Sequence, residues 1–310
     1  MSLLARPSLA SPAAKVMQRL NALLSDRHVA SSLHKRYPEY PRTTHELTIP
    51  TSVAPARAVV YVPDRPDDAP LPPVHVNFHG GGFVLPPVEL DDPLCRFLAA
   101  ETGAVVVNVD YVVAPQHPFP APPRQAYEIV RWVAEHSAEH GWDGGLLTVG
   151  GQSAGGALAA AVARQALEKG GPAIALQILH YPPLDLVTDA RDKRSVIAKP
   201  LLRPWMADIF DTCYVPDRAM RGDPLASPGH PGDTADLTGI APALVITPEH
   251  DLLRAEGTRY AERLRGVGAL REQVDVPGAD HGYDQKDADT AREIYGLMAR
   301  HMRQAVTPDR

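Results

Sequence analysis

Cysteine is scarce in this sequence: Cys95 and Cys213 are the two that occur among 310 residues. They lie far apart and match no spacing typical of a metal or redox motif. We therefore expect two reduced, packed thiols and a cytoplasmic location, because a reducing compartment keeps such thiols free.

Basic charge and long apolar runs are scarce as well. A net charge of −6 leaves no basic patch that could bind a nucleic acid. No run is long and apolar enough to cross a bilayer, and Arg6 and Pro7 interrupt the N-terminal apolar residues that a secretory signal would need. We therefore expect no nucleic-acid partner and no membrane partner.

Strand-like and helix-like segments alternate along a chain that is 44% hydrophobic and long enough to form one large α/β domain. Strands are expected at 46–49, 58–62, 74–78, 104–109, 146–149, 174–179, 243–247 and 273–276. Helices are expected at 91–102, 123–140, 157–169, 253–267 and 288–306. This alternation predicts a doubly wound α/β fold, whose mostly parallel sheet is covered on both faces.

Two segments depart from the alternation. Residues up to about 40 show apolar residues at helical spacing before a break at 37–41. These apolar residues are Val16, Met17, Leu20, Leu23 and Leu24. Residues 181–238 contain the apolar cluster Leu201, Leu202, Trp205, Met206, Ile209, Phe210 and Tyr214. We expect the first segment to lean over the body, and the second to cover the carboxyl ends of the strands, where sites in such sheets lie.

The segment 149–156 contains Ser153 between Gly151 and Gly155, in the pattern G-x-S-x-G. The glycines let the preceding strand and the following helix approach closely, while the serine takes a strained backbone conformation at the turn. The serine hydroxyl then projects at the N-terminus of a helix, where free N–H groups favour negative charge. Ser153 is therefore the candidate nucleophile.

His79 and three glycines directly follow the expected strand 74–78. Consecutive glycines let a backbone pass close to a ligand and direct N–H groups at it, as stabilisation of an oxyanion requires. The N–H groups of Gly81, Gly82 and Ala154 are expected to form this oxyanion hole. His79 is expected to hold the glycine loop and not to touch the substrate.

A serine nucleophile needs a base, and the base needs an orienting carboxylate. After this kind of turn the acid and then the base come on loops that follow later strands. Asp251 follows strand 243–247 and His281 follows strand 273–276, so both lie where these partners are needed. The rival acids are Glu249, Asp275 and Asp280, and the rival bases are His250 and His301.

Several motifs occur in a fixed order: HGGGF at 79–83, DYVVAPQHPFPA at 110–121, GQSAGG at 151–156, DLL at 251–253 and HGY at 281–283. In this combination the chain resembles the hormone-sensitive-lipase-like family of esterases within the α/β-hydrolase superfamily. The resemblance covers about residues 45–305. It implies one α/β-hydrolase domain over 1–310 with an eight-stranded sheet, a helical cap formed by about 1–45 and 181–238, and no cofactor.

Carried over by motif, the resemblance makes Ser153 the nucleophile, His281 the base and Asp251 its orienting acid. The run 110–121 is expected to pack and hydrogen-bond the loop beneath the active site. The family usually has an acidic residue where Gln152 stands, and a proline where Leu252 stands.

A competing pattern, H-x-x-E-H, is satisfied by residues 136–140 and is typical of one class of zinc protease. It lies at the polar end of an expected helix, and no third ligand is apparent. We therefore expect a solvated helix end there and no metal.

The sequence thus predicts a serine carboxylesterase that forms an acyl-enzyme on a small-molecule ester with a short to medium acyl chain. Phe83, Trp205, Met206 and Phe210 are expected to bind the substrate. The alternatives are an amidase or peptidase with the same triad, and a non-catalytic small-molecule receptor on this scaffold. A homodimer is compatible with the sequence.

Overall fold

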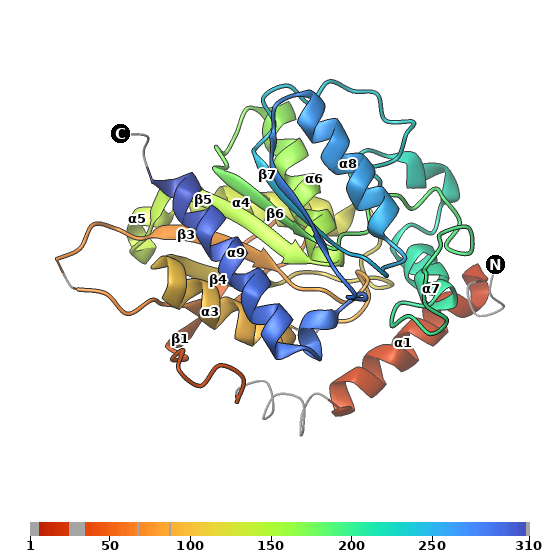
Figure 1. Cartoon of the computed structure of the whole chain (residues 1–310), viewed down its shortest axis with the longest axis horizontal. Coiled ribbons are helices and arrows are strands. Elements are labelled where there is room, and N and C mark those ends of the chain that lie inside the picture. Colours follow the sequence, from red (N-terminus) through yellow and green to blue (C-terminus); the bar gives the residue numbers. More distant parts are fainter. Residues whose placement is uncertain (1–5, 25–34, 67, 87, 308–310) are drawn as a thin grey trace.

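The computed structural model describes residues 6–24, 35–66, 68–86 and 88–307. Within these ranges the strands form an eight-stranded sheet in the order β1-β2-β4-β3-β5-β6-β7-β8 (Figure 1). The strands are β1 Thr44–Ile49, β2 Ala56–Tyr61, β3 Pro73–Phe78, β4 Val105–Asp110, β5 Asp143–Gln152, β6 Leu176–His180, β7 Ala243–Pro248 and β8 Leu270–Val276. β2 runs antiparallel to both of its neighbours, and the strands from β4 to β8 are parallel. The predicted mostly parallel sheet is confirmed.

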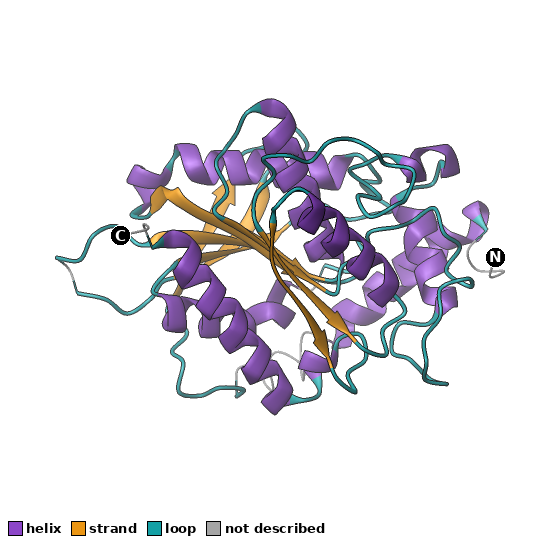
Figure 2. Ribbon diagram, turned by 45° about the horizontal axis from the view of Figure 1, so that its top comes forward, coloured by secondary structure: helices purple, strands orange, loops and turns teal. Residues whose placement is uncertain are grey.

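Helices cover both faces of the sheet, as Figure 2 shows. They are α3 Asp92–Thr102, α4 Ala121–Glu135, α6 Ala154–Lys169, α8 Arg254–Gly266 and α9 Ala288–Val306. Residues of α3 and α9 share one hydrophobic core with the sheet, and residues of α4, α6 and α8 share the other. Because β4 is covered on both faces, every residue from Val105 to Val109 is buried, which explains why this strand is nearly continuous in apolar residues.

The helix expected at 123–140 is in fact two helices. α4 begins earlier, at Ala121, because prolines are tolerated in a first turn whose N–H groups have no partner within the helix. α4 ends at Glu135, and the short α5 Ser137–His140 follows. Between them, His136 leaves the helical conformation with φ −104° and ψ 16°, and its ring stacks on Trp132.

Two further helices, α1 Pro7–Leu24 and α7 Pro204–Tyr214, pack against each other beside the end of the sheet from which the active-site loops leave (Figure 1). Gln18 ties α1 to the body, because its amide donates to the carbonyl oxygens of Val84 (2.7 Å) and Ala114 (3.0 Å). The expectation that the N-terminal helix leans over the body is confirmed for α1.

The face that α1 buries is not the predicted one. Val16 and Leu20 are about half exposed, at 55% and 53%, whereas Ala10 and Ala14 are buried in the core. Small alanine side chains allow two helices to approach closely, so the alanine face meets the body and the larger aliphatic residues stay outside. Of the other residues named, Met17 packs against the core, and the side chains of Leu23 and Leu24 lie outside the described part of the chain, as do residues 25–34.

Both cysteines are free and buried, as the sequence predicts. In the described part of the chain, no helix has the length and apolar character required to cross a membrane.

Candidate active site

Ser153 occupies the turn between β5 and α6 with φ 52° and ψ −119°, a conformation that costs a non-glycine residue about 1–3 kcal/mol. α6 starts at Ala154, three residues before the predicted start, so the serine stands directly at the helix N-terminus. A Cβ atom on Gly151 or Gly155 would collide with the carbonyl oxygen of Phe78 in β3. Glycine at these two positions therefore lets strand and helix meet closely enough to form the sharp turn.

The loops after β7 and β8 bring an acid and an imidazole to this serine. His281 Nε2 lies 3.0 Å from Ser153 Oγ, and His281 Nδ1 lies 2.8 Å from Asp251 Oδ2. The other carboxylate oxygen of Asp251 accepts the backbone N–H of Leu253 at 3.0 Å. In this arrangement Nδ1–H donates to the carboxylate, and Nε2 is free to accept the serine proton.

The rival acids and bases point elsewhere. Their nearest recorded partners are Gly278 for Glu249, Arg254 for Asp275, Leu201 for Asp280, Glu249 for His250 and Glu272 for His301. The structure therefore brings Ser153, His281 and Asp251 together and leaves all five rivals out of the hydrogen-bonded line.

The electrostatic setting of His281 favours its protonated form. Burial disfavours a charged imidazole, but the carboxylate of Asp251 outweighs it, and the pKa of His281 is raised above its usual 6.5. The side chain of Asp251 is fully buried and that of His281 is 11% exposed, so water screens this pair weakly. An imidazolium that forms during a reaction is therefore stabilised in place.

Three backbone N–H groups lie beside the serine without acceptors. In the described residues, no recorded hydrogen bond uses the N–H groups of Gly81, Gly82 or Ala154. Gly81 and Gly82 have φ of +115° and +61°, and the loop turns back on itself so that the N–H groups of Val84 and Leu85 donate to the carbonyl oxygen of Gly81. The predicted oxyanion donors are thus available for a ligand.

The run 110–121 supports the glycine loop, as predicted. The hydroxyl of Tyr111 donates to the carbonyl of His79 at 2.9 Å, and the two rings stack with centroids 4.3 Å apart. The N–H of Ala114 donates to the carbonyl of Phe83 at 2.8 Å. His79 itself is fully buried, and burial lowers its pKa to about 4, so it packs as a neutral ring that holds the loop.

The sequence reasoning did not anticipate Asp284, a buried carboxylate behind the site. It accepts hydrogen bonds from the amide of Gln152 and from the hydroxyls of Tyr181 (2.6 Å) and Tyr295 (2.9 Å). The Tyr181 ring lies against His281, with centroids 4.8 Å apart. Asp284 thus holds the ring that packs on the imidazole. The sequence held one signal of this contact. Gln152 stands where the family usually has an acid, and an acid at this position would face the carboxylate of Asp284.

A cavity of about 300 Å³ lies over Ser153 and His281. Phe83, Met206 and Phe210, three of the residues predicted to bind the substrate, line it. Trp205, the fourth residue predicted to bind the substrate, does not line it and is 43% exposed. The reason is helical geometry: Met206 and Phe210 are four residues apart and share one face of α7, whereas Trp205 lies on the adjacent face. Lining residues that the sequence reasoning did not assign to the site include Asn21, Leu85, Tyr181, Leu201 and Leu202.

The H-x-x-E-H segment has other contacts. His136 Nδ1 lies 3.0 Å from the carbonyl oxygen of Trp132, and the ring of His140 stacks on Trp142. Among the described residues, no group of three or more histidine, cysteine or acidic side chains is arranged to hold a metal ion.

The sheet, the strained serine between β5 and α6, and the loops that follow β7 and β8 are those of an α/β hydrolase. Comparison with known proteins agrees. A family model described as alpha/beta hydrolase fold matches residues 75–285. Esterase LipI of Mycobacterium tuberculosis is 35% identical over 238 residues, which are 77% of this chain and 74% of LipI.

An ethyl acetate hydrolase of Pseudomonas putida is 34% identical over 229 residues, which cover 72% of this chain and 70% of that enzyme. Among solved structures, an esterase of Pyrobaculum calidifontis has a TM-score of 0.83 and 35% identity, covering 95% of this chain and 94% of the esterase. The chain belongs to this α/β-hydrolase family, in its hormone-sensitive-lipase-like group. It is a carboxylic ester hydrolase.

Proposed function

We propose that the enzyme hydrolyses esters through an acyl-enzyme on Ser153. His281 takes the Oγ proton while Oγ attacks the ester carbonyl, and Asp251 holds the imidazole and stabilises its charge. The proton then passes to the leaving alcohol as the ester C–O bond breaks. Water activated by His281 releases the acid and restores the serine.

The charge that develops on the carbonyl oxygen is accepted by the N–H groups of Gly81, Gly82 and Ala154. Such donors, already in place before reaction, typically contribute about 10²–10³-fold to the rate each. The observation that carries the whole proposal is the continuous line from Ser153 through His281 to Asp251, at 3.0 and 2.8 Å, beside amides with no other acceptor.

We propose short to medium acyl chains, from acetyl to hexanoyl, as the preferred substrates. The cavity of about 300 Å³ is at the lower end of the range for small-molecule sites, which is about 300–1,000 Å³. Its lining by Phe83, Met206 and Phe210 favours an apolar chain. The similarity to an ethyl acetate hydrolase supports a small substrate.

We further propose that α1 and the segment 181–238 act as a cap on a single α/β-hydrolase domain. Asn21 of α1 and Met206 of α7 both line the cavity, so these segments together close one side of the substrate site. The homodimer stays a prediction, which light scattering on the purified protein tests.

The central test is Ser153→Ala, assayed with p-nitrophenyl butyrate and with a fluorophosphonate probe that labels activated serines. We expect a loss of about 10⁴-fold or more in kcat and no labelling, because the nucleophile is gone. Ser52→Ala is the matched control, since that surface hydroxyl bonds only to Glu128 among the recorded contacts. A near-native rate of Ser153→Ala would refute the mechanism.

Substrate range is tested by comparing kcat/KM along a series of acyl chains. Acetyl to hexanoyl esters should be hydrolysed faster than long-chain triglycerides, and the reverse ranking would contradict a small acyl site. Faster cleavage of anilides than of matched esters would indicate the amidase alternative.

A further inference from the structure

Besides Asp91, whose carboxyl accepts a hydrogen bond from Asn77, an acidic and a basic side chain line the cavity that holds Ser153, although an apolar acyl chain needs neither. Asp211 comes from α7, and Lys193 comes from the segment between β6 and α7. Both are nearly buried: Asp211 is 8% exposed, and the side chain of Lys193 is 6% exposed. Buried charges are unfavourable unless they are paired, so each requires a physical account.

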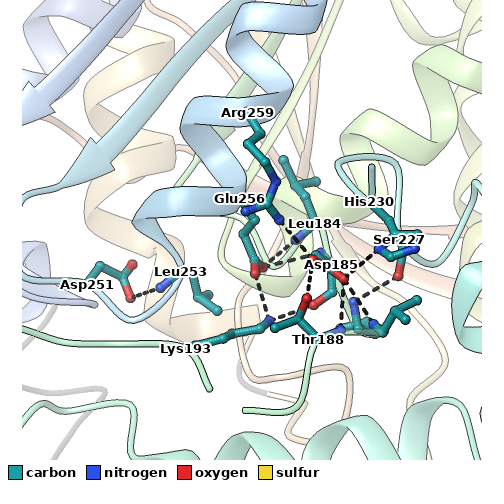
Figure 3. A network of polar contacts seen from close by, with 12 residues as sticks. Leu184, Asp185, Thr188, Lys193, Ser227, His230, Asp251, Leu253, Glu256 and Arg259 are labelled. Atoms are coloured by element: carbon teal, nitrogen blue, oxygen red, sulfur yellow. Dashed lines mark hydrogen bonds and ion pairs between the residues drawn. The ribbon is translucent and has the colours of Figure 1, made fainter. Parts of the chain in front are cut away.

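Lys193 is paired on the side away from the cavity. Its Nζ lies 2.7 Å from Glu256 Oε2 and 2.6 Å from the carbonyl oxygen of Asp185 (Figure 3). These partners hold the ammonium in place. Burial lowers the pKa of Lys193, but the carboxylates of Glu256, Asp211 and Asp185 together outweigh it, so this pKa is raised. An ammonium group has three N–H donors, and the two recorded partners leave one of them for a ligand in the cavity.

Asp211 has no such partner. In the described part of the chain, no residue forms a hydrogen bond or an ion pair with its carboxylate. The carboxylate oxygens also do not belong to the fully enclosed polar atoms that lack a partner. The carboxylate is therefore open to the cavity. Burial raises its pKa to about 6, with Lys193 acting in the opposite direction, so the ionised form prevails at neutral pH.

The two groups offer a ligand one acceptor and one donor. A hydroxyl group suits both, because it has a proton to donate to Asp211 and lone pairs to accept a hydrogen bond from Lys193. An ammonium group on the substrate would be repelled by Lys193, and a carboxylate would be repelled by Asp211. A plain alkyl chain would displace water from both charges and replace none of its hydrogen bonds.

We propose that Asp211 and Lys193 form a hydroxyl subsite within the ester cavity, so that the preferred substrates are esters with a hydroxyl group on their acyl or alcohol part. This inference rests on the proposed function of Ser153. Asp211 is then a specificity-determining residue, which binds substrate away from the reacting carbonyl.

The test compares kcat/KM for two pairs of esters at about pH 8, where the carboxylate is ionised. The acyl pair is p-nitrophenyl butyrate and p-nitrophenyl β-hydroxybutyrate. The alcohol pair is ethyl butyrate and hydroxyethyl butyrate. In one of the pairs we expect the wild type to prefer the hydroxylated member by about tenfold, as a hydrogen bond to a charged group predicts. The pair that responds tells which part of the ester carries the hydroxyl group.

Asp211→Asn and Asp211→Ala should lower that preference to about one. Asp192→Asn is the matched control, since it removes one exposed aspartate from the same covering segment. It should leave the preference unchanged.

Equal rates for both members of both pairs in the wild type would overturn the subsite, as would a preference that survives in Asp211→Asn and Asp211→Ala. A faster rate with the β-amino ester than with the β-hydroxy ester would also overturn it, because Lys193 would then play no part. Turnover of p-nitrophenyl butyrate and fluorophosphonate labelling require Ser153 and its triad partners but no hydroxyl subsite. If these persist while selectivity fails, the subsite is wrong and the esterase mechanism stands; if the wild type lacks both, the proposed function is wrong as well.

Discussion

The contact between Gln152 and Asp284 allows a sharp test of the buried network behind the active site. In the wild type the amide of Gln152 donates to the Asp284 carboxylate, which is 2% exposed. The substitution Gln152→Glu keeps the shape of the side chain and places an acid against this carboxylate. The introduced acid can keep the hydrogen bond only while it holds a proton.

The size of the effect follows from the geometry. Two like charges about 4 Å apart, at an effective dielectric constant of about 20, repel each other by about 4 kcal/mol. This corresponds to a rise of about 3 units, from about 4.3 to about 7, in the folded-state pKa of the introduced glutamate. The folded variant then holds a proton that the unfolded variant releases, so its stability relative to the wild type falls as pH rises. We expect almost no penalty near pH 4 and about 4 kcal/mol near pH 8.

The measurement is urea unfolding of the wild type and the variant at several values between about pH 4 and about pH 8, over which the penalty should develop. Gln152→Met is the control, because it removes the amide donor but adds no charge. Its loss should be about 1.5–3 kcal/mol and should not vary with pH, since Tyr181 and Tyr295 still donate to Asp284. Parallel pH profiles for the two variants, or a Gln152→Glu variant as stable as the wild type at the highest pH, would refute the reasoning.

Three further predictions concern the site and its supports. Because the pKa of His281 is raised, kcat/KM should reach half its maximum above pH 6.5 on the acid side. Asp251→Asn should move this midpoint to lower pH and reduce kcat by about 10⁴-fold. An unmoved midpoint would count against the electrostatic coupling of Asp251 to His281. Gly155→Ala should lower the free energy of unfolding by about 3 kcal/mol or prevent folding, because its methyl group meets the carbonyl oxygen of Phe78. The control Gly296→Ala, in an α9 position with open space around it, should be neutral or stabilising by up to about 1 kcal/mol. Similar changes in stability for the two variants would contradict this account. A strong chelator should leave ester hydrolysis unchanged, and activity lost to the chelator and restored by zinc would revive the metal hypothesis.

Apolar runs and glycine motifs in the sequence were sufficient to predict the sheet and the order of the site residues. β4 could be recognised because both of its faces are covered, which favours a nearly continuous apolar run. The turn at Ser153 could be recognised because backbone contact with Phe78 excludes any side chain at Gly151 and Gly155. Such requirements act on neighbouring residues, so they leave a pattern in the local sequence.

The sequence could not place residues whose surroundings depend on segments that are distant along the chain. The period of α1 indicates a helix, but it could not show that the alanine face would be the buried one and leave Val16 and Leu20 outside. Trp205 is as apolar as Met206, and only the orientation of α7 over the cavity separates them.

Local chemistry along the chain was therefore enough for the fold class, the serine turn and the most suitable acid and base. Folding was needed to exclude Glu249 as the acid, to join Gln152 to Asp284 across 132 positions, and to bring Asp211 and Lys193 to one cavity. The physical reason is that backbone preferences act over a few residues, whereas burial, charge pairing and the shape of a cavity depend on which distant segments meet.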